Sequence, residues 1–255
     1  MNQISALFKK EAVESIRNFK LFLLLAVFII IGIISPLTAY LMPDIMTMVM
    51  KDAGIKFELP VVTAVDSYVQ FFGNMNQLGL PILVIVTGSI LTNEFSRNTL
   101  INLLTKGLKR HNVMLVKFLY TILMWTVVYV FGAVTAYLYT IYYWENELEN
   151  ILAAFGLTWL YGIFLISVIM MASAIFRTSF LGVLFTVLGV VIIMIIASIY
   201  PMTAEYLPQY LLTSNMSLLT GETGMSDVMP AVLITAGASI LIFLLSIVTF
   251  NKAVI

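Results

Sequence analysis

The sequence predicts an all-α integral membrane protein with six transmembrane helices. Of its 255 residues, 61% are hydrophobic and only 10% are charged, whereas soluble domains carry about 25% charged residues. Apolar stretches recur that are long enough to cross a hydrocarbon core about 30 Å thick, which needs roughly 20 helical residues. These stretches lie at residues 21–41, 71–92, 113–142, 151–176, 180–200 and 230–250. No internal repeat or linker is evident, so a single transmembrane domain is expected to cover residues 1–255.

Residues 1–20 predict an amphipathic helix that lies in the membrane interface before the first span. Its apolar side chains recur at helical spacing, and the charged residues lie largely on the other faces. The apolar face consists of Ile4, Leu7, Phe8, Ala12, Ile16 and Phe19. The plainer alternative is a positively charged anchor that leads into the first span.

The segments between the spans are expected to differ in kind. Residues 42–66 contain Pro, Gly and charged residues, which predicts an external loop with a short helix at 44–53. Residues 201–229 predict a second, longer external segment. Pro81 is expected to kink the second span, because proline removes a helical hydrogen bond and clashes with the preceding turn. Six spans place both termini on the same side of the membrane.

The basic residues predict which side that is. Eleven of the thirteen Lys and Arg residues lie on the side of the termini, and only Lys51 and Lys56 lie on the other. Because cytoplasmic segments carry the excess of Lys and Arg, the termini and the segment 93–117 are expected in the cytoplasm. Lys117, near the cytoplasmic end of the third span, is expected to extend its ammonium group to the lipid headgroups.

Several functions are disfavoured by residues that the sequence lacks. No Asp, Glu, Lys or Arg lies in the middle of a span, although ion-coupled transporters and voltage sensors depend on such groups. There is no G-x-x-x-x-G-K-[ST] loop for ATP phosphates, and no H-E-x-x-H or G-x-S-x-G motif. One His and no Cys make a metal site unexpected. We therefore expect no catalysis in this chain, and active transport would need energy from another chain.

The polar segment 93–117 is the most informative part of the sequence. It carries five Lys and Arg residues between two apolar stretches. Leu100, Leu103, Leu104 and Leu108 are spaced as on one face of a short helix. Such a helix either docks on a cytoplasmic partner or rests on lipid, in which case its basic residues only set the topology.

Three runs of sequence resemble the membrane (permease) subunit of ABC-2 type ABC transporters. The first is EFSRNTLINLLTKGLKR at 94–110, which is similar to the family's acidic residue, small polar pair, Leu-rich helix and basic turn. Asn98 stands where Gly is usual and Gly107 stands near the usual Pro, and both residue types allow a turn. The runs ALFKKE at 6–11 and DSYVQFF at 66–72 are also similar to bacterial members. The order of these runs within six spans makes the resemblance fairly specific.

The resemblance implies that ATP and Mg²⁺ are bound by a separate cytoplasmic ATPase, so this chain needs no cofactor of its own. The short helix after the second span would be the coupling helix that docks on this ATPase. Its contact residues would be Glu94, Phe95, Arg97, Asn98, Leu100, Leu103 and Leu104. A second contact with the ATPase would be made by Phe8, Lys9 and Glu11.

The resemblance also implies a second permease copy, identical or related, in the bacterial cytoplasmic membrane, and re-entrant helices before the sixth span. Small residues at helical spacing indicate where helices approach closely. Such faces are Gly132 and Ala136 in the third span, and Ala231, Thr235 and Ser239 in the sixth. Because the family places the fifth span near the subunit contact, the expected dimer residues are Gly182, Thr186 and Gly189.

The expected function is therefore the transmembrane subunit of an ATP-driven exporter. Spans without buried charge suit an amphipathic or hydrophobic cargo, such as a peptide toxin, a bacteriocin or a drug, and some family members provide immunity to bacteriocins. Export of a lipid-linked glycan or of ions is the alternative with the same architecture. A membrane scaffold or sensor that transports nothing is the alternative of a different class, favoured if no ATPase gene lies nearby.

Overall fold

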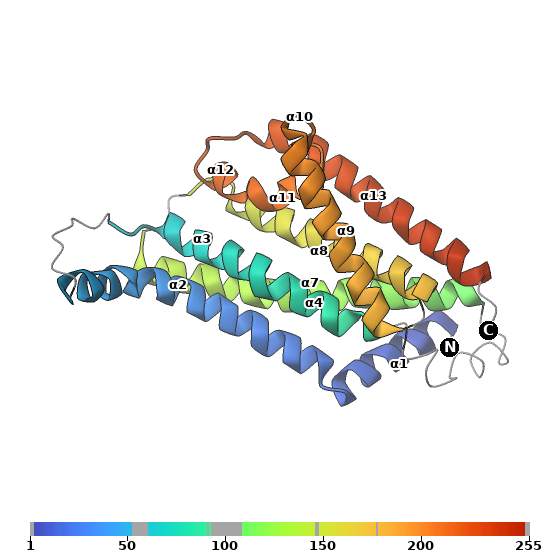
Figure 1. Ribbon diagram of the computed structural model, residues 1–255. Coiled ribbons are helices and arrows are strands. Elements are labelled where there is room, and N and C mark those ends of the chain that lie inside the picture. The colour runs from blue at the N-terminus through green and yellow to red at the C-terminus, as the bar shows by residue number, and fades with distance from the viewer. Residues whose placement is uncertain are drawn as a thin grey trace.

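The computed structural model describes residues 3–52, 61–90, 92, 109–145, 148–176 and 178–252, in which all regular structure is helical (Figure 1). The element η1 is a π-helical turn. The elements in chain order are α1 (Gln3–Arg17), α2 (Lys20–Asp52), α3 (Ala64–Asn74), η1 (Met75–Gly79), α4 (Leu80–Thr87), α7 (Arg110–Tyr143), α8 (Ile151–Phe176), α9 (Ser179–Ile199), α10 (Pro201–Ala204), α11 (Tyr210–Thr213), α12 (Asn215–Leu219) and α13 (Met225–Lys252).

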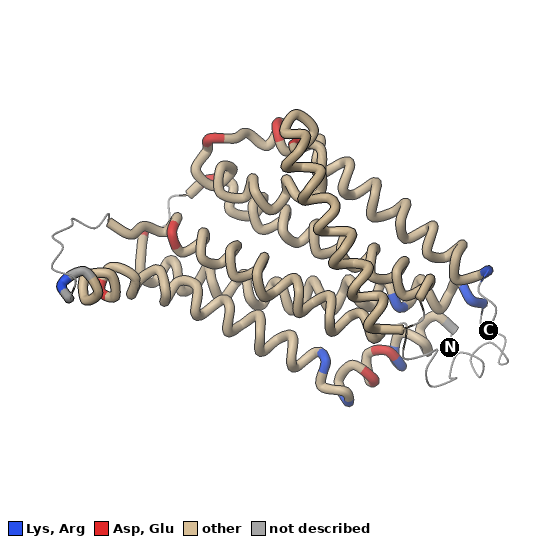
Figure 2. The backbone as a smooth tube through the Cα atoms, in the orientation of Figure 1, with Lys and Arg blue, Asp and Glu red and all other residues tan. Residues whose placement is uncertain are grey.

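Six helical units are long and apolar enough to cross a membrane, and this number confirms the prediction. Their bounds are Lys20–Val49, Ala64–Thr87, Arg110–Tyr143, Ile151–Phe176, Ser179–Ile199 and Met225–Lys252. The charged residues gather toward the ends of the bundle (Figure 2), where water can hydrate them. By length and composition the chain is an all-helical, multi-pass membrane protein.

The first span is longer than predicted. α2 includes residues 42–52, which the sequence assigned to an external loop, and it contains both Pro36 and Pro43. Directly before this extension, Tyr40 stacks on Tyr143 of α7 with ring centroids 4.4 Å apart. This aromatic contact joins α2 to α7.

The second span begins at Ala64, earlier than predicted, and is interrupted near its middle by η1. Pro81 explains the interruption, since it has no N–H and its ring would clash with the carbonyl of residue 77 in a regular α-helix. The N–H of Leu80 instead bonds to the carbonyl of Met75, which closes a π-turn. The expected distortion at Pro81 is thus a π-turn directly before the proline.

The remaining four spans begin and end within five residues of their predicted bounds. Among them, α7 and α8 form the centre of the bundle, with α2 along α7 and α13 along α8. Trp125 of α7 is fully buried, and its Nε1 donates to the carbonyl of Trp159 at 2.9 Å. Gly162 leaves room for this indole ring, because a Cβ at that position would overlap it. α9 lies on the outside, and within it only Gly182 and Thr186 are buried.

Both small-residue faces predicted from the sequence are buried at helix contacts. Gly32 of α2 meets Gly132 of α7, since a Cβ added to Gly32 would lie 2.5 Å from the Gly132 carbonyl oxygen. The face on α13 is buried where that helix packs along α8. Its residues are Ala231, Thr235 and Ser239. Close approach of backbones therefore holds the bundle together at two places.

Short helices fill the connection between α9 and α13. α11 and α12 pack against α8, and the Asn215 amide is hydrogen-bonded to the Thr158 hydroxyl of α8 at 2.9 Å. The apolar side chains that these two helices bury are Leu211, Leu212, Leu218 and Leu219. The part formed by α11 and α12 is packed on the bundle, whereas α10 buries no residue.

Candidate functional site

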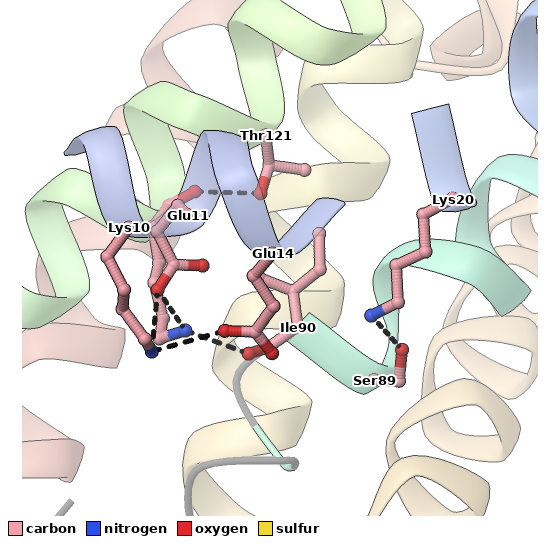
Figure 3. A network of polar contacts seen from close by, with 8 residues as sticks. Lys10, Glu11, Glu14, Lys20, Ser89, Ile90 and Thr121 are labelled. Atoms are coloured by element: carbon pink, nitrogen blue, oxygen red, sulfur yellow. Dashed lines mark hydrogen bonds and ion pairs between the residues drawn. The ribbon is translucent and has the colours of Figure 1, made fainter. Parts of the chain in front are cut away.

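A buried ion pair stands out among the charged residues that the structure describes. The ammonium group of Lys117 lies 2.8 Å from a carboxylate oxygen of Glu11, and the two side chains are only 1% and 5% exposed. Lys117 Nζ also donates to the carbonyl of Ile90 at 3.0 Å. The three groups come from α1, from α7 and from the segment after α4, and Figure 3 shows Glu11 and Ile90 in this network. We call this set the Glu11–Lys117 clamp.

The packing of α1 places Glu11 at this position. Leu7, Glu11 and Ser15 follow one another at intervals of four residues, so they share one helical face, and all three are buried. This face packs on α7, where Phe8 meets the ring of Tyr120 edge to face at a centroid distance of 5.5 Å. Glu11 therefore points into the bundle.

Several large apolar residues in α1 and directly after it are exposed. Ile4 and Ile16, both from the predicted apolar face, are 45% and 46% exposed, and Phe19 is 70% exposed. Phe19 has a positive φ of 57°, and α1 meets α2 there at a sharp corner (Figure 1). The exposed apolar residues suit a helix beside lipid, as expected for the segment 1–20.

Electrostatics explain why two charges can remain in this buried place. An isolated buried charge costs several kcal/mol, and removal of one member of a buried pair leaves that cost uncompensated. Lys10 Nζ also lies 3.3 Å from carboxylate oxygens of both Glu11 and Glu14. The cluster thus contains two ammonium groups and two carboxylates, and their charges balance.

The clamp borders both ends of the segment predicted to couple. Ile90 lies at the end of the second span and Lys117 lies in the first turns of α7, so they flank residues 93–108. Nearby, Lys20 of α2 donates to the Ser89 hydroxyl at 2.7 Å (Figure 3). One group of side chains therefore ties α1 and the start of α2 to the flanks of this segment.

The predicted coupling residues themselves lie outside the described residues. They are Glu94, Phe95, Arg97, Asn98, Leu100, Leu103 and Leu104. Their predicted role therefore stays a prediction.

The second predicted contact set lies on α1. Lys9 is exposed, Phe8 is half-buried against Tyr120, and the Glu11 carboxylate is occupied by Lys117. Of the three, Lys9 is the residue whose side chain faces outward. Glu11 instead acts inside the chain.

The residues expected at the dimer contact face two directions. Gly182 and Thr186 are buried, and a Cβ on Gly182 would lie 3.3 Å from Ser173 Oγ of α8. Gly189 has no atom within 4 Å of its Cβ position. The first two residues thus make contacts within the chain, whereas Gly189 leaves space that another molecule can occupy.

Lys117 differs from the expectation for its side chain. We expected its ammonium group to reach the headgroups, but it is buried and paired with Glu11. The pairing joins residues 106 positions apart, and no local pattern predicts such a contact. The sequence contained one indication that Glu11 is buried. Glu11 lies four residues after Leu7 and therefore on the same helical face as this apolar residue.

The described residues contain no group of three or more His, Cys, Asp or Glu side chains that could hold a metal ion. What the arrangement can do is transmit force, since a buried ion pair joins an N-terminal helix to two spans. A comparison of the sequence with protein-family models and with curated proteins finds no match.

Proposed function

We propose that this chain is the transmembrane subunit of an ATP-driven exporter of the ABC-2 type, powered by a separate cytoplasmic ATPase. The sequence resemblance at 6–11, 66–72 and 94–110 supports this proposal, together with six membrane-spanning helices. The excess of basic residues near the termini supports a cytoplasmic location for both ends in a bacterial cytoplasmic membrane.

The observation that carries the proposal is the Glu11–Lys117 clamp. A conformational change of the ATPase moves the spans only if the contacts that connect them are rigid. The clamp connects α1 to Ile90 at the end of span two and to α7 of span three. Force applied to α1 or to residues 93–108 is therefore delivered to the same two spans. A mere topological anchor would need no buried ion pair.

The proposed assembly has two ATPase contacts and a second permease copy. The segment 94–104 docks in a groove of the ATPase through its Leu face, flanked by Glu94 and Arg97. The exposed Lys9 of α1 lies beside that surface and makes the second contact. Two permease copies, identical or related, form the path for an amphipathic or hydrophobic cargo, and the short helices between α9 and α13 close its outer end.

The test is a coupling experiment on the permease purified with the ATPase from the neighbouring reading frame. The double variant Glu94→Ala/Arg97→Ala should still insert and fold, because both residues are proposed to act at the partner surface. We expect ATPase stimulation by the permease, and transport into inverted vesicles, to fall at least tenfold. That fall corresponds to about 1.4 kcal/mol or more of lost coupling.

The matched control removes one basic and one acidic residue at the other end of the bundle. Lys51→Ala/Glu149→Ala should leave ATPase stimulation and transport unchanged. Equal activity of the coupling variant and this control would refute docking at 94–104. A permease that never co-purifies with an ATPase would favour a scaffold or sensor. ATPase stimulation by ions alone, or by lipid-linked glycans alone, would show that the cargo belongs to that class.

A further inference from the structure

A lateral cavity of about 410 Å³ lies between the second span, α8, α9 and α11. Most of its wall is aliphatic, and the described residues that line it include no Asp, Glu, Lys, Arg or His. Representative wall residues are Val84, Ile85, Leu165, Val183, Val187 and Met194. Pockets of roughly 300–1,000 Å³ with mostly apolar walls accommodate drug-sized ligands.

The π-turn brings polar groups to this apolar cavity. Asn76 and Gln77 belong to η1, and both line the cavity together with Pro81. A π-turn adds a residue to the helical turn, so the side chains after it are rotated relative to a regular helix, and such turns occur frequently at functional sites. The break in span two therefore coincides with the polar part of the cavity wall.

A third carboxamide comes from the connection before α11. The hydroxyl of Tyr161, itself 2% exposed, donates to Gln209 Oε1 at 3.0 Å, and both residues line the cavity. This bond occupies the amide oxygen of Gln209 and orients the group, so its nitrogen remains as a donor. The Asn76 Oδ1 atom is buried and has no hydrogen-bond partner, but it is an acceptor, so the donor that the cavity offers to a ligand oxygen is the Gln209 nitrogen.

We propose that this cavity binds a neutral amphiphile of drug size. Its apolar body lies on the aliphatic wall, and its carbonyl or ether oxygen accepts a hydrogen bond from the amide nitrogen of Gln209. A charged ligand is disfavoured because the lining offers no countercharge, and burial of an unpaired charge is costly. A folded peptide or a glycan chain exceeds the volume.

The site goes beyond the proposed function, because it requires neither an ATPase nor transport. It can therefore be tested on the purified permease alone, and its failure leaves the ATPase proposal unaffected. Combined with that proposal, it narrows the cargo to small neutral amphiphiles. Two sources share the chemistry, namely a free small molecule and a membrane phospholipid, whose ester groups also carry carbonyl oxygens.

The experiment is photolabelling with benzophenone, which has a carbonyl acceptor and inserts into neighbouring C–H bonds on irradiation. The permease is labelled in dodecyl maltoside, and modified peptides are mapped by mass spectrometry. We expect labelling to concentrate on the cavity wall, at Met194 and its neighbours on α9 and α4. The competitors 9-fluorenone and fluorene differ in the carbonyl group, and we expect 9-fluorenone to compete at roughly a tenth of the fluorene concentration.

Three variants separate the hydrogen bond from the cavity itself. Gln209→Met should remove the preference for 9-fluorenone but retain labelling, because it replaces an amide by an apolar side chain of similar size. Val187→Trp should abolish labelling, because the indole fills the cavity. Leu188→Trp is the matched control, since Leu188 is the adjacent residue, is similarly exposed at 51% against 48%, and is not part of the cavity lining. It should leave labelling unchanged.

Labelling spread evenly over the lipid-facing helices, or equal competition by fluorene and 9-fluorenone, would overturn the proposal. Equal labelling of the Val187→Trp and Leu188→Trp variants would do the same. Addition of diacyl phosphatidylcholine distinguishes the two sources. If this addition abolishes labelling, the site exists and phospholipid occupies it. If labelling persists, the site exists and takes a free small molecule.

Discussion

At the scale of single residues, Lys117 and Glu11 show how a charged side chain comes to be buried in a membrane protein. Each group alone would be costly in this place, whereas together they balance, and Lys117 additionally donates to a backbone carbonyl. Buried pairs of this kind contribute little net stability, but loss of one member is severe. The pair therefore fixes the position of α1 more than it adds stability. The buried charge of Glu11 is compensated where it meets Lys117.

The first prediction concerns this pair. Lys117→Met removes the buried cation and leaves the Glu11 carboxylate with only the partly exposed Lys10 beside it, so we expect the free energy of unfolding in mixed micelles to fall by about 3–5 kcal/mol. Lys117→Met combined with Glu11→Leu removes both charges and should recover most of the loss.

Lys10→Met is the matched control for this prediction. The Lys10 side chain also lies next to Glu11 but is 37% exposed, so its removal should cost no more than about 1 kcal/mol. If Lys117→Met proved as mild as Lys10→Met, the clamp would not hold α1 in place.

At the scale of elements, the helices are organised by small residues and by one proline. The crossing of α2 and α7 depends on two glycines that allow the backbones to touch. Pro81 converts one turn of span two into a π-turn and thereby opens the polar part of the lateral cavity. In both cases a residue type with special backbone properties decides the position of a whole helix.

The second prediction compares two glycine substitutions. A Cβ on Gly132 would lie 2.9 Å from the Phe28 carbonyl oxygen, so Gly132→Ala forces α2 away and should lower the free energy of unfolding by about 1–3 kcal/mol. Gly156→Ala adds a Cβ where no atom lies within 4 Å. It should leave stability unchanged or raise it by up to about 1 kcal/mol, because Ala favours helix.

Thermal unfolding in the same detergent measures both glycine variants side by side. Opposite signs support a direct contact of the α2 and α7 backbones. A stabilising effect of Gly132→Ala would contradict that contact.

At the scale of the whole molecule, the first turns of α1 and the end of α13 lie at the same end of the bundle (Figure 1). This follows from an even number of spans. The segments near that end hold most of the basic residues of the sequence, which is the asymmetry that orients membrane proteins. The end of α2 and the start of α3 lie at the opposite end (Figure 1).

The third prediction concerns orientation in the membrane. The chain has no Cys, so a single introduced thiol reports on one position. A membrane-impermeant maleimide should label Val61→Cys and Met202→Cys in intact cells, since these residues are 88% and 93% exposed. Lys9→Cys and Lys252→Cys should react only after permeabilisation. The reverse pattern would mean that the termini lie outside.

Much of the fold could be predicted from sequence, because a membrane span is a local property. A run of about twenty consecutive apolar residues identifies a span without information from the rest of the chain. α8 was accordingly predicted with its observed bounds, 151–176. The end of α2 was missed because its extension beyond residue 41 carries Pro43 and charged residues, which are typical of a loop. The candidate site was not predicted, since Glu11 was expected to contact an ATPase and its pairing with Lys117 was not foreseen.

The sequence by itself determined that this is a six-span membrane protein with its charges near the ends, because hydropathy and charge act residue by residue. Only the tertiary structure decided which charges meet, which small residues face one another, and where a cavity remains. Lys117 finds Glu11 across 106 positions, and the cavity wall combines four elements that are separated along the chain. Such arrangements arise from the packing of whole helices, and helix packing depends on non-local contacts.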